Sequence, residues 1–303
     1  MTAPTHAHDP VNNLRGIAAM LGAMAAFVLN DALVKLAAGT MPMGEVIFLR
    51  GIFTVLLCLA LLMATESPAR LREAAQPRIV ARGLMDVGSA LTFLFALQNM
   101  PIADAYAILQ FTPLGITAGA ALFLGARVGW RRWLATTVGL VGVLVIIKPG
   151  AGTFNASSVL ALVSIGFAVA RDLITRGIGH NIPSMVIALA SPVLLTSITA
   201  LFSAVEPWRA PSALGLGYIV GAGVLLLIGQ LALIKAMRTG EIAVVAPFRY
   251  SIIVWSILAG LAIWHELPDL RTCFGIAIVF AAGLYTFLRE QKLSRAIAKA
   301  APA

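Results

Sequence analysis

The sequence predicts an all-α integral membrane protein with ten transmembrane helices, arranged as two inverted five-helix repeats around a central cavity. Three observations lead to this prediction. Hydrophobic residues make up 60% of the 303-residue chain and charged residues only 12%, whereas about 25% of a soluble domain is charged. The apolar residues fall into runs long enough to cross a membrane. The basic residues gather in alternate gaps between these runs.

Each predicted span is an apolar run close to the roughly 20 residues that a helix needs to cross ~30 Å of hydrocarbon. The runs are too long for transmembrane strands and do not alternate as such strands do. Pro, Gly or charged residues separate neighbouring runs, as at Pro101 and Lys148-Pro149-Gly150. The predicted spans are 14–37, 46–64, 79–98, 102–123, 131–147, 157–174, 184–202, 214–236, 242–264 and 271–288.

The net charge of +9 follows the gaps between spans and does not line a nucleic-acid-binding face. Cytoplasmic loops of membrane proteins are enriched in Lys and Arg. This bias predicts that both termini are cytoplasmic, in a bacterial-type inner membrane. Few basic residues then lie on the other side: Lys35, Arg50, Lys148, Arg209 and Arg271. The polar segment 1–13 does not read as a cleavable signal peptide.

A weak internal similarity at an offset of about 140 residues predicts the two repeats, residues 1–150 and 151–303. Segments 102–147 and 242–288 share the order helix, break, Arg and Gly-containing helix. Because five spans is an odd number, the second repeat must enter the membrane with opposite polarity. Inverted repeats are typical of transporters, with the substrate site near the bilayer midplane between the halves.

The chain resembles the drug/metabolite transporter superfamily, in its ten-helix branch of EamA-type transporters. Four stretches carry the resemblance: Phe27 to Lys35, Glu45 to Gly51, Phe111 to Gly125, and Pro247 to Glu266. Within the family it looks most like YddG-type exporters of aromatic amino acids. The resemblance implies export of small metabolites, with amino acids first and drugs or other metabolites as the alternative.

Ionisable residues inside spans cost several kcal/mol unless they are paired or hydrated, and so mark candidate sites. Asn30 and Asp31 lie in the first span, where Asp31 and Lys35 are spaced to pair. They form either a gate or a helix-end ion pair. Arg50, in the second span, could meet a substrate carboxylate or Asp31, or could extend towards the membrane surface. Asp86 and Ser89 share one side of the third span; Asp86 could bind an amine or a proton, or pair with Arg82.

Further candidates lie in later spans. Tyr106 and Gln110 share a face of the fourth span, as cavity lining or as interhelical hydrogen-bonding groups. Gln230 lies deep in the eighth span, with the same two alternatives. In the ninth span, Arg249 and Tyr250 could capture a carboxylate, or Arg249 could extend to the surface. Arg171-Asp172, at the end of the sixth span, is interpreted as a cytoplasmic cap.

The sequence therefore predicts a gradient-driven secondary transporter that works by alternating access, and the resemblance implies that it exports small amphiphilic metabolites, first among them amino acids, aromatic ones included. We expect no catalytic, cofactor-binding or metal site, because no P-loop, GxGxxG motif or His/Cys cluster is present. The expected partners are a small-molecule substrate and the lipid bilayer, and no nucleic acid is expected. For the oligomeric state, a monomer is one option. The alternatives are an integral-membrane enzyme acting on a lipid-linked substrate, and a channel.

Overall fold

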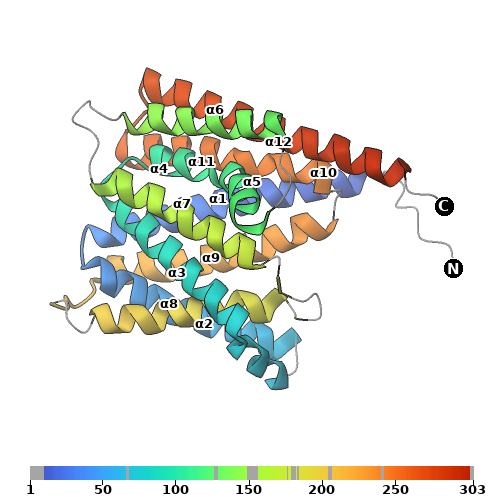
Figure 1. The fold of residues 1–303 in the computed structure, drawn as a ribbon. Helices are drawn as coiled ribbons and strands as arrows, with labels where there is room; N and C mark the ends of the chain where they lie inside the picture. Colours follow the sequence, from blue (N-terminus) through green and yellow to red (C-terminus); the bar gives the residue numbers. More distant parts are fainter. Residues whose placement is uncertain are drawn as a thin grey trace.

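The computed structural model describes residues 10–65, 68–125, 129–148, 156–175, 177–178, 182, 184–203, 207–239 and 242–300. All regular secondary structure within these ranges is helical (Figure 1). The eight longest helices are α1 (Pro10–Ala38), α2 (Met43–Thr65), α3 (Pro77–Gln98), α6 (Trp130–Ile147), α7 (Ala156–Thr175), α8 (Ser184–Ser203), α9 (Ala213–Thr239) and α12 (Leu270–Ala300). A short 3₁₀ helix, η1 (Pro68–Ala75), connects α2 and α3.

Two predicted spans are interrupted. The span predicted as one helix over 102–123 consists of α4 (Ile102–Leu109) and α5 (Thr112–Leu124). Pro113 lacks an N–H and cannot bond the carbonyl of Leu109, and the Thr112 hydroxyl donates to that carbonyl instead, at 2.6 Å. The predicted span 242–264 is divided into α10 (Ile242–Val245), the 3₁₀ helix η2 (Ala246–Tyr250), α11 (Ser251–Ala259) and the π-helical turn η3 (Gly260–Trp264).

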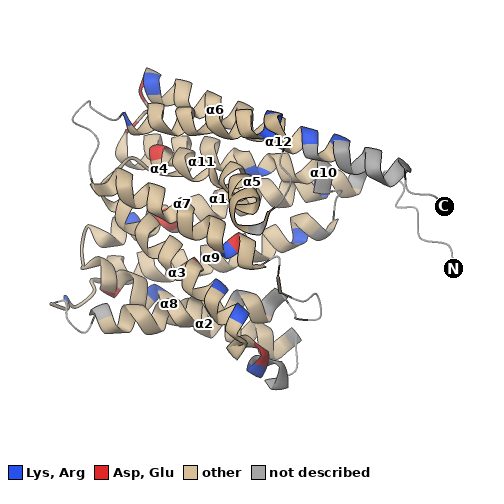
Figure 2. Ribbon diagram, in the orientation of Figure 1, with Lys and Arg blue, Asp and Glu red and all other residues tan. Residues whose placement is uncertain are grey.

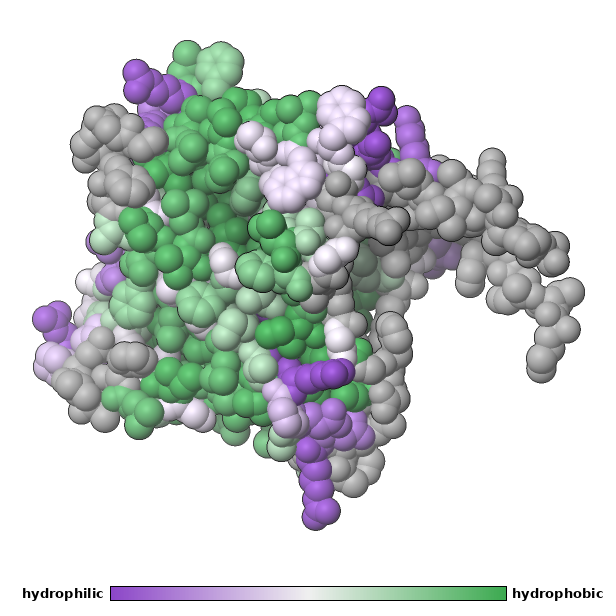
Figure 3. Space-filling view, viewed as in Figure 1, coloured by the Kyte–Doolittle hydropathy of each residue, from purple (hydrophilic) through white to green (hydrophobic). Residues whose placement is uncertain are grey.

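The all-α membrane architecture is confirmed. Nine helical segments in the described part of the chain are long and apolar enough to cross a membrane, and two of these segments are the interrupted spans. The one predicted span outside this set, 184–202, corresponds to α8. This helix has 20 residues, but its apolar stretch is shorter, Leu189–Leu201. Apolar side chains cover the middle of the molecule, and hydrophilic ones gather towards its ends (Figure 3). Exposed Leu122, Phe123 and Leu134 belong to this apolar surface, as expected for contact with lipid tails.

The helices pack in pairs: α1 with α9, α3 with α7, α2 with α8, α6 with α12, and α4 with α11. Suppose that each of the first five spans is exchanged with the span at the same position among the last five. The α1–α9 pair then becomes the α7–α3 pair, and each of the other three pairs is mapped onto itself. This exchange supports the predicted inverted repeats, whose boundary near residue 150 stays a prediction. The backbones of α6 and α12 lie very close to each other, because a Cβ on Gly275 would lie 2.8 Å from the Gly142 carbonyl oxygen.

The start of α1 and the end of α12 lie at the same end of the molecule, here called the inner end and predicted to be cytoplasmic (Figure 1). Many of the Lys and Arg residues in the described part lie towards this end (Figure 2). The opposite, outer end is tied by polar contacts between elements. Lys35 of α1 donates to the Met100 carbonyl at 2.7 Å and lies over the Trp264 ring. The Arg209 N–H donates to Glu45 at 3.1 Å.

A third contact at the outer end joins α6 to α12. Lys148 terminates α6 in a left-handed conformation, with φ of 54°, and its ammonium group donates to Asp269 at 2.7 Å. Asp269 also accepts the Thr272 N–H at 2.9 Å, which caps the N-terminus of α12. The hydrogen bond from Lys148, together with that from Thr272, lowers the pKa of Asp269 to about 2.

This pKa predicts how the stability of the outer end depends on pH. A carboxyl whose pKa is lowered on folding stabilises the protein above its unfolded pKa of about 3.9, and the stabilisation is lost as the pH falls through about 2. We therefore expect Asp269→Asn to lower the thermal midpoint in detergent by the same amount at pH 5 and pH 8. The difference from wild type should shrink only below about pH 4. A difference that changes between pH 5 and 8 would assign the titration to another group.

Candidate functional site

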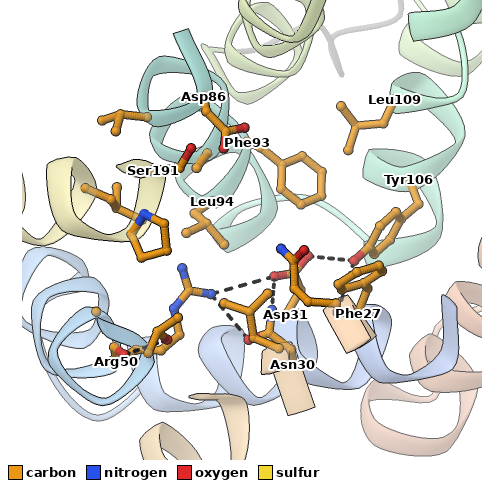
Figure 4. Close-up of a pocket in the computed structure, with 18 of the residues that line it drawn as sticks. Phe27, Asn30, Asp31, Arg50, Asp86, Phe93, Leu94, Tyr106, Leu109 and Ser191 are labelled. Carbon is orange, nitrogen blue, oxygen red and sulfur yellow. Dashed lines mark hydrogen bonds and ion pairs between the residues drawn. The ribbon is translucent and has the colours of Figure 1, made fainter. Parts of the chain in front are cut away.

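A cavity of about 350 Å³ lies between α1, α2, α3, α4, α8 and α9 (Figure 4). We call it the outer cavity, because its Asp31 and Arg50 each lie seven residues from the outer end of their helix, roughly 10 Å at 1.5 Å per residue. Its volume is at the lower end of the roughly 300–1,000 Å³ that is typical of small-molecule sites. Its polar lining includes six residues: Asn30, Asp31, Arg50, Asp86, Tyr106 and Gln230.

Asp31 is the centre of a polar network inside this cavity (Figure 4). Its carboxylate accepts the Tyr106 hydroxyl at 2.6 Å and the Asn30 amide at 2.7 Å. The Arg50 guanidinium lies 4.0 Å away. The predicted pairing of Asp31 with Lys35 is wrong, because Lys35 extends to the Met100 carbonyl. Asp31 thus faces the neighbouring helices and not the next turn of its own helix.

Arg50 is buried, and this excludes its extension to the membrane surface. The residue is only 5% exposed, and one guanidinium nitrogen donates to Asn30 at 3.4 Å. The long 4.0 Å separation from Asp31 leaves room for a ligand oxygen to compete for the same donors. Removing such a charge from water costs several kcal/mol, which the network around Asp31 offsets in part.

A second charged cluster joins α3 to α7. Arg171 donates to Asp86 at 2.8 Å and to Asp172 at 2.8 Å. The expected alternative partner of Asp86, Arg82, instead donates to Ser191 at 3.1 Å and to Thr175 at 3.2 Å. Arg171-Asp172, interpreted as a cytoplasmic cap, does not end α7, which continues to Thr175. Arg171 joins α7 to α3 through Asp86, and both side chains line a cavity.

That cavity, of about 380 Å³, is the inner cavity. Arg171 and Asp172 place it towards the inner end, within four residues of the end of α7. Four of the predicted site residues line it in addition to Tyr106: Ser89, Gln110, Arg249 and Tyr250. The Ser89 hydroxyl already donates to the Ser164 carbonyl at 3.0 Å, so this group joins α3 to α7. Arg249 makes no hydrogen bond or ion pair with any residue in the described ranges.

The ten predicted site residues therefore divide between two adjacent cavities. Sequence reasoning did not select Arg82, Ser191, Arg171 or Asp172 as lining residues. The i,i+4 spacing of Arg82 and Asp86 could have indicated that Arg82 lies near the cavity. The position of Ser191 could not be predicted in this way, because it depends on how α8 packs against the other helices. Within the described residues, no group of three or more His, Cys, Asp and Glu side chains could hold a metal ion.

The outer network predicts a charge-coupled stability pattern. Removal of one partner leaves an uncompensated buried charge, which costs about 3–5 kcal/mol. We expect Arg50→Gln and Asp31→Asn each to lower the thermal midpoint in detergent. The double variant should be more stable than either single variant, because neither charge remains. Additive losses in this double-mutant cycle would show that the two groups do not interact.

Comparison with known proteins shows a family match in the first half of the chain and transporter relatives over most of its length. Residues 14–148 match the model of the EamA-like transporter family. A pseudopaline exporter of Pseudomonas aeruginosa is 29% identical over 87% of this chain and 93% of its own length. An S-adenosylmethionine uptake transporter of Rickettsia conorii is 28% identical over 92% of this chain and 94% of its own length. A riboflavin transporter of Vibrio cholerae is 30% identical over 65% of this chain and 66% of its own length.

The fold has a counterpart among solved structures. One crystal structure superposes with a TM-score of 0.62 over 91% of this chain and 98% of its own chain, at 19% identity. That likeness supports the fold alone. The names of the three relatives do not support the narrower resemblance to aromatic amino-acid exporters. The chain is a multi-pass membrane protein whose residues 14–148 match the EamA-like transporter family, and it is similar over most of its length to proteins named as transporters.

Proposed function

We propose that this protein is a secondary transporter that exports small zwitterionic metabolites, amino acids among them, by alternating access. The observation that carries the proposal is the Arg50–Asp31 pair, 4.0 Å apart, on the wall of a cavity among the membrane spans. A cation and an anion at this spacing can bind the carboxylate and the ammonium of one zwitterion. The substrate then replaces an internal ion pair with two external ones, which limits the cost of burying charge.

The guanidinium of Arg50 has donors to spare. An arginine side chain has five N–H donors, and the hydrogen bond to Asn30 is long, at 3.4 Å. In contrast, Arg171 makes two contacts of 2.8 Å with carboxylates. A substrate carboxylate can therefore bind Arg50 in a bidentate manner. Asp31 is available as the acceptor for the ammonium.

The rest of the outer cavity is apolar and partly aromatic. Phe27, Phe93, Leu94 and Ile252 are among its lining residues, and Phe93 packs edge-to-face on Tyr106 with ring centroids 5.5 Å apart. Such walls suit the side chain of an amphiphilic substrate. S-adenosylmethionine, the substrate in the names of the Rickettsia relatives, carries an amino-acid carboxylate and ammonium in addition to its sulfonium charge, in agreement with binding by such a pair.

The proposed direction is outward, as in the names of the Pseudomonas relatives. The Rickettsia relatives are named as uptake transporters, and flux measured separately in each direction distinguishes export from uptake. A secondary transporter fits the absence of any P-loop from the sequence. Exchange separates this proposal from a channel, because substrate on the far side of the membrane accelerates flux through a carrier that alternates between two states.

Flux in proteoliposomes tests the proposal. The purified chain, reconstituted in liposomes, should exchange at least one radiolabelled amino acid from a panel, with and without a pH gradient. We expect Arg50→Gln to reduce the flux about tenfold or more, because a hydrogen bond to a charged group contributes about 1.5–3 kcal/mol and 1.4 kcal/mol corresponds to a factor of ten.

Arg209→Gln is the matched control. It makes the same chemical change on an exposed side chain, and the backbone N–H that contacts Glu45 remains. Its flux should equal that of wild type. The absence of flux for every amino acid in the panel would remove the proposed substrate class. Equal losses in the two Arg variants would remove the role of Arg50.

A further inference from the structure

The inner cavity is distinct from the site proposed above and is built in part from other elements. α1, α3, α5, α7, η2 and α12 all contribute to its lining. Among the residues that the structure describes, four line both cavities: Phe27, Tyr106, Leu109 and Ile252. Three of these residues are apolar, and the hydroxyl of the fourth, Tyr106, is occupied by Asp31 at 2.6 Å. The shared residues therefore form an apolar partition between two chambers of similar volume.

The charged side chains around the partition include one more cation than anions. Asp86 and Asp172 both bind Arg171, at 2.8 Å each. Arg82 lies in the same region on the outer-cavity side, one helical turn from Asp86, and donates to Ser191. These two acids and two guanidinium groups balance one another. Arg249 is the additional positive charge. It interacts electrostatically with Asp172, which Arg171 already binds, and it has no hydrogen bond or salt bridge with any described residue.

Arg249 is held where a ligand can reach it. It lies in η2, the 3₁₀ segment that interrupts the ninth span. Arg249 is solvent-accessible although η2 lies between other spans. Interrupted helices of this kind line the substrate sites of many transporters. Polar groups of Gln110, Thr117 and Tyr250 line the same cavity. A guanidinium group that has polar neighbours, and whose neighbouring acid Asp172 already binds Arg171, suits a carboxylate.

We propose that the inner cavity is a second carboxylate-binding site, centred on Arg249, that holds the substrate on the inner side of the partition. This inference rests on the proposed transport of zwitterionic metabolites. It adds a second occupied position in series with the Arg50–Asp31 site, so that one chain binds two substrate molecules. The aromatic and apolar partition separates the two positions while Tyr106 is bonded to Asp31.

The first experiment needs no substrate. Thr117, on the wall of the inner cavity, is changed to Cys in a full-length chain in which Cys58 and Cys273 are replaced by Ala. Modification rates are measured with an anionic methanethiosulfonate, the ethylsulfonate, and a cationic one, the ethyltrimethylammonium. We expect Arg249→Gln to lower the anion-to-cation rate ratio about threefold or more, because loss of one unit charge acts on the two reagents in opposite directions.

Arg131→Gln is the matched control, because Arg131 lies exposed at the start of α6 and does not line the inner cavity. Its ratio should equal that of the Thr117→Cys parent, and Arg249→Lys should keep the ratio. Arg249→Met provides a second neutral variant if Arg249→Gln does not fold. An unchanged ratio in the folded neutral variant would overturn the anion site.

The second experiment measures stoichiometry by equilibrium binding of the radiolabelled amino acid that gives the largest flux. We expect two molecules per chain in wild type, one in Arg249→Gln, one in Arg50→Gln and none in the double variant. One molecule per wild-type chain, unchanged in Arg249→Gln, would overturn the second site. Absence of both flux and binding would refute the proposed function, and the rate ratio at Thr117→Cys would then decide the inner anion site alone.

Discussion

The structure depends on the compensation of charges that its own apolar spans keep away from water. Arg50 and Asp31 lie among helices whose outer surfaces are apolar, where an unpaired charge costs several kcal/mol. Asn30 and Tyr106 complete the network around the Asp31 carboxylate, and each comes from a position that helix packing must hold. The chemistry of the outer cavity therefore depends directly on how α1, α2 and α4 pack together. The 4.0 Å separation of the pair satisfies packing and still leaves donors for a ligand.

The interrupted helices serve the same arrangement. A continuous helix satisfies its own backbone and offers only side chains to a cavity. Breaks beside Gln110 and across Ala246–Tyr250 place irregular backbone next to the inner cavity. Thr112 compensates the carbonyl that Pro113 leaves free. The two breaks fall at corresponding places in the proposed repeats, so that each half contributes one interrupted span to the centre. Two chambers, divided by four shared residues, follow from that placement.

Much of this architecture could be predicted from the sequence, because span length and the charge of the loops are local properties. The spans were predicted within a few residues, except that two were taken as continuous. A proline shows where a helix weakens but not whether tertiary packing keeps it straight. The candidate residues were found because intramembrane charge is rare. Their partners were found only in part, since pairing depends on helix neighbours. Asp31 was one of the alternatives considered for Arg50 and lies 4.0 Å from it, but Lys35, matched with Asp31 by spacing alone, bonds the Met100 carbonyl. Arg171 was assigned to the surface by its position at a helix end, although α3 lies against it and supplies Asp86.

Water access to the polar face of α2 tests the central claim most directly. In a chain with Cys58 and Cys273 replaced by Ala, Thr54→Cys lines the outer cavity, whereas Leu56→Cys lies on the exposed apolar side of the same helix. In liposomes, a water-soluble thiol reagent should modify Thr54→Cys, more slowly when the transported amino acid is present, and should leave Leu56→Cys unmodified. Modification of Leu56→Cys with Thr54→Cys inert would contradict both the lipid-facing surface and the aqueous cavity on which the account depends.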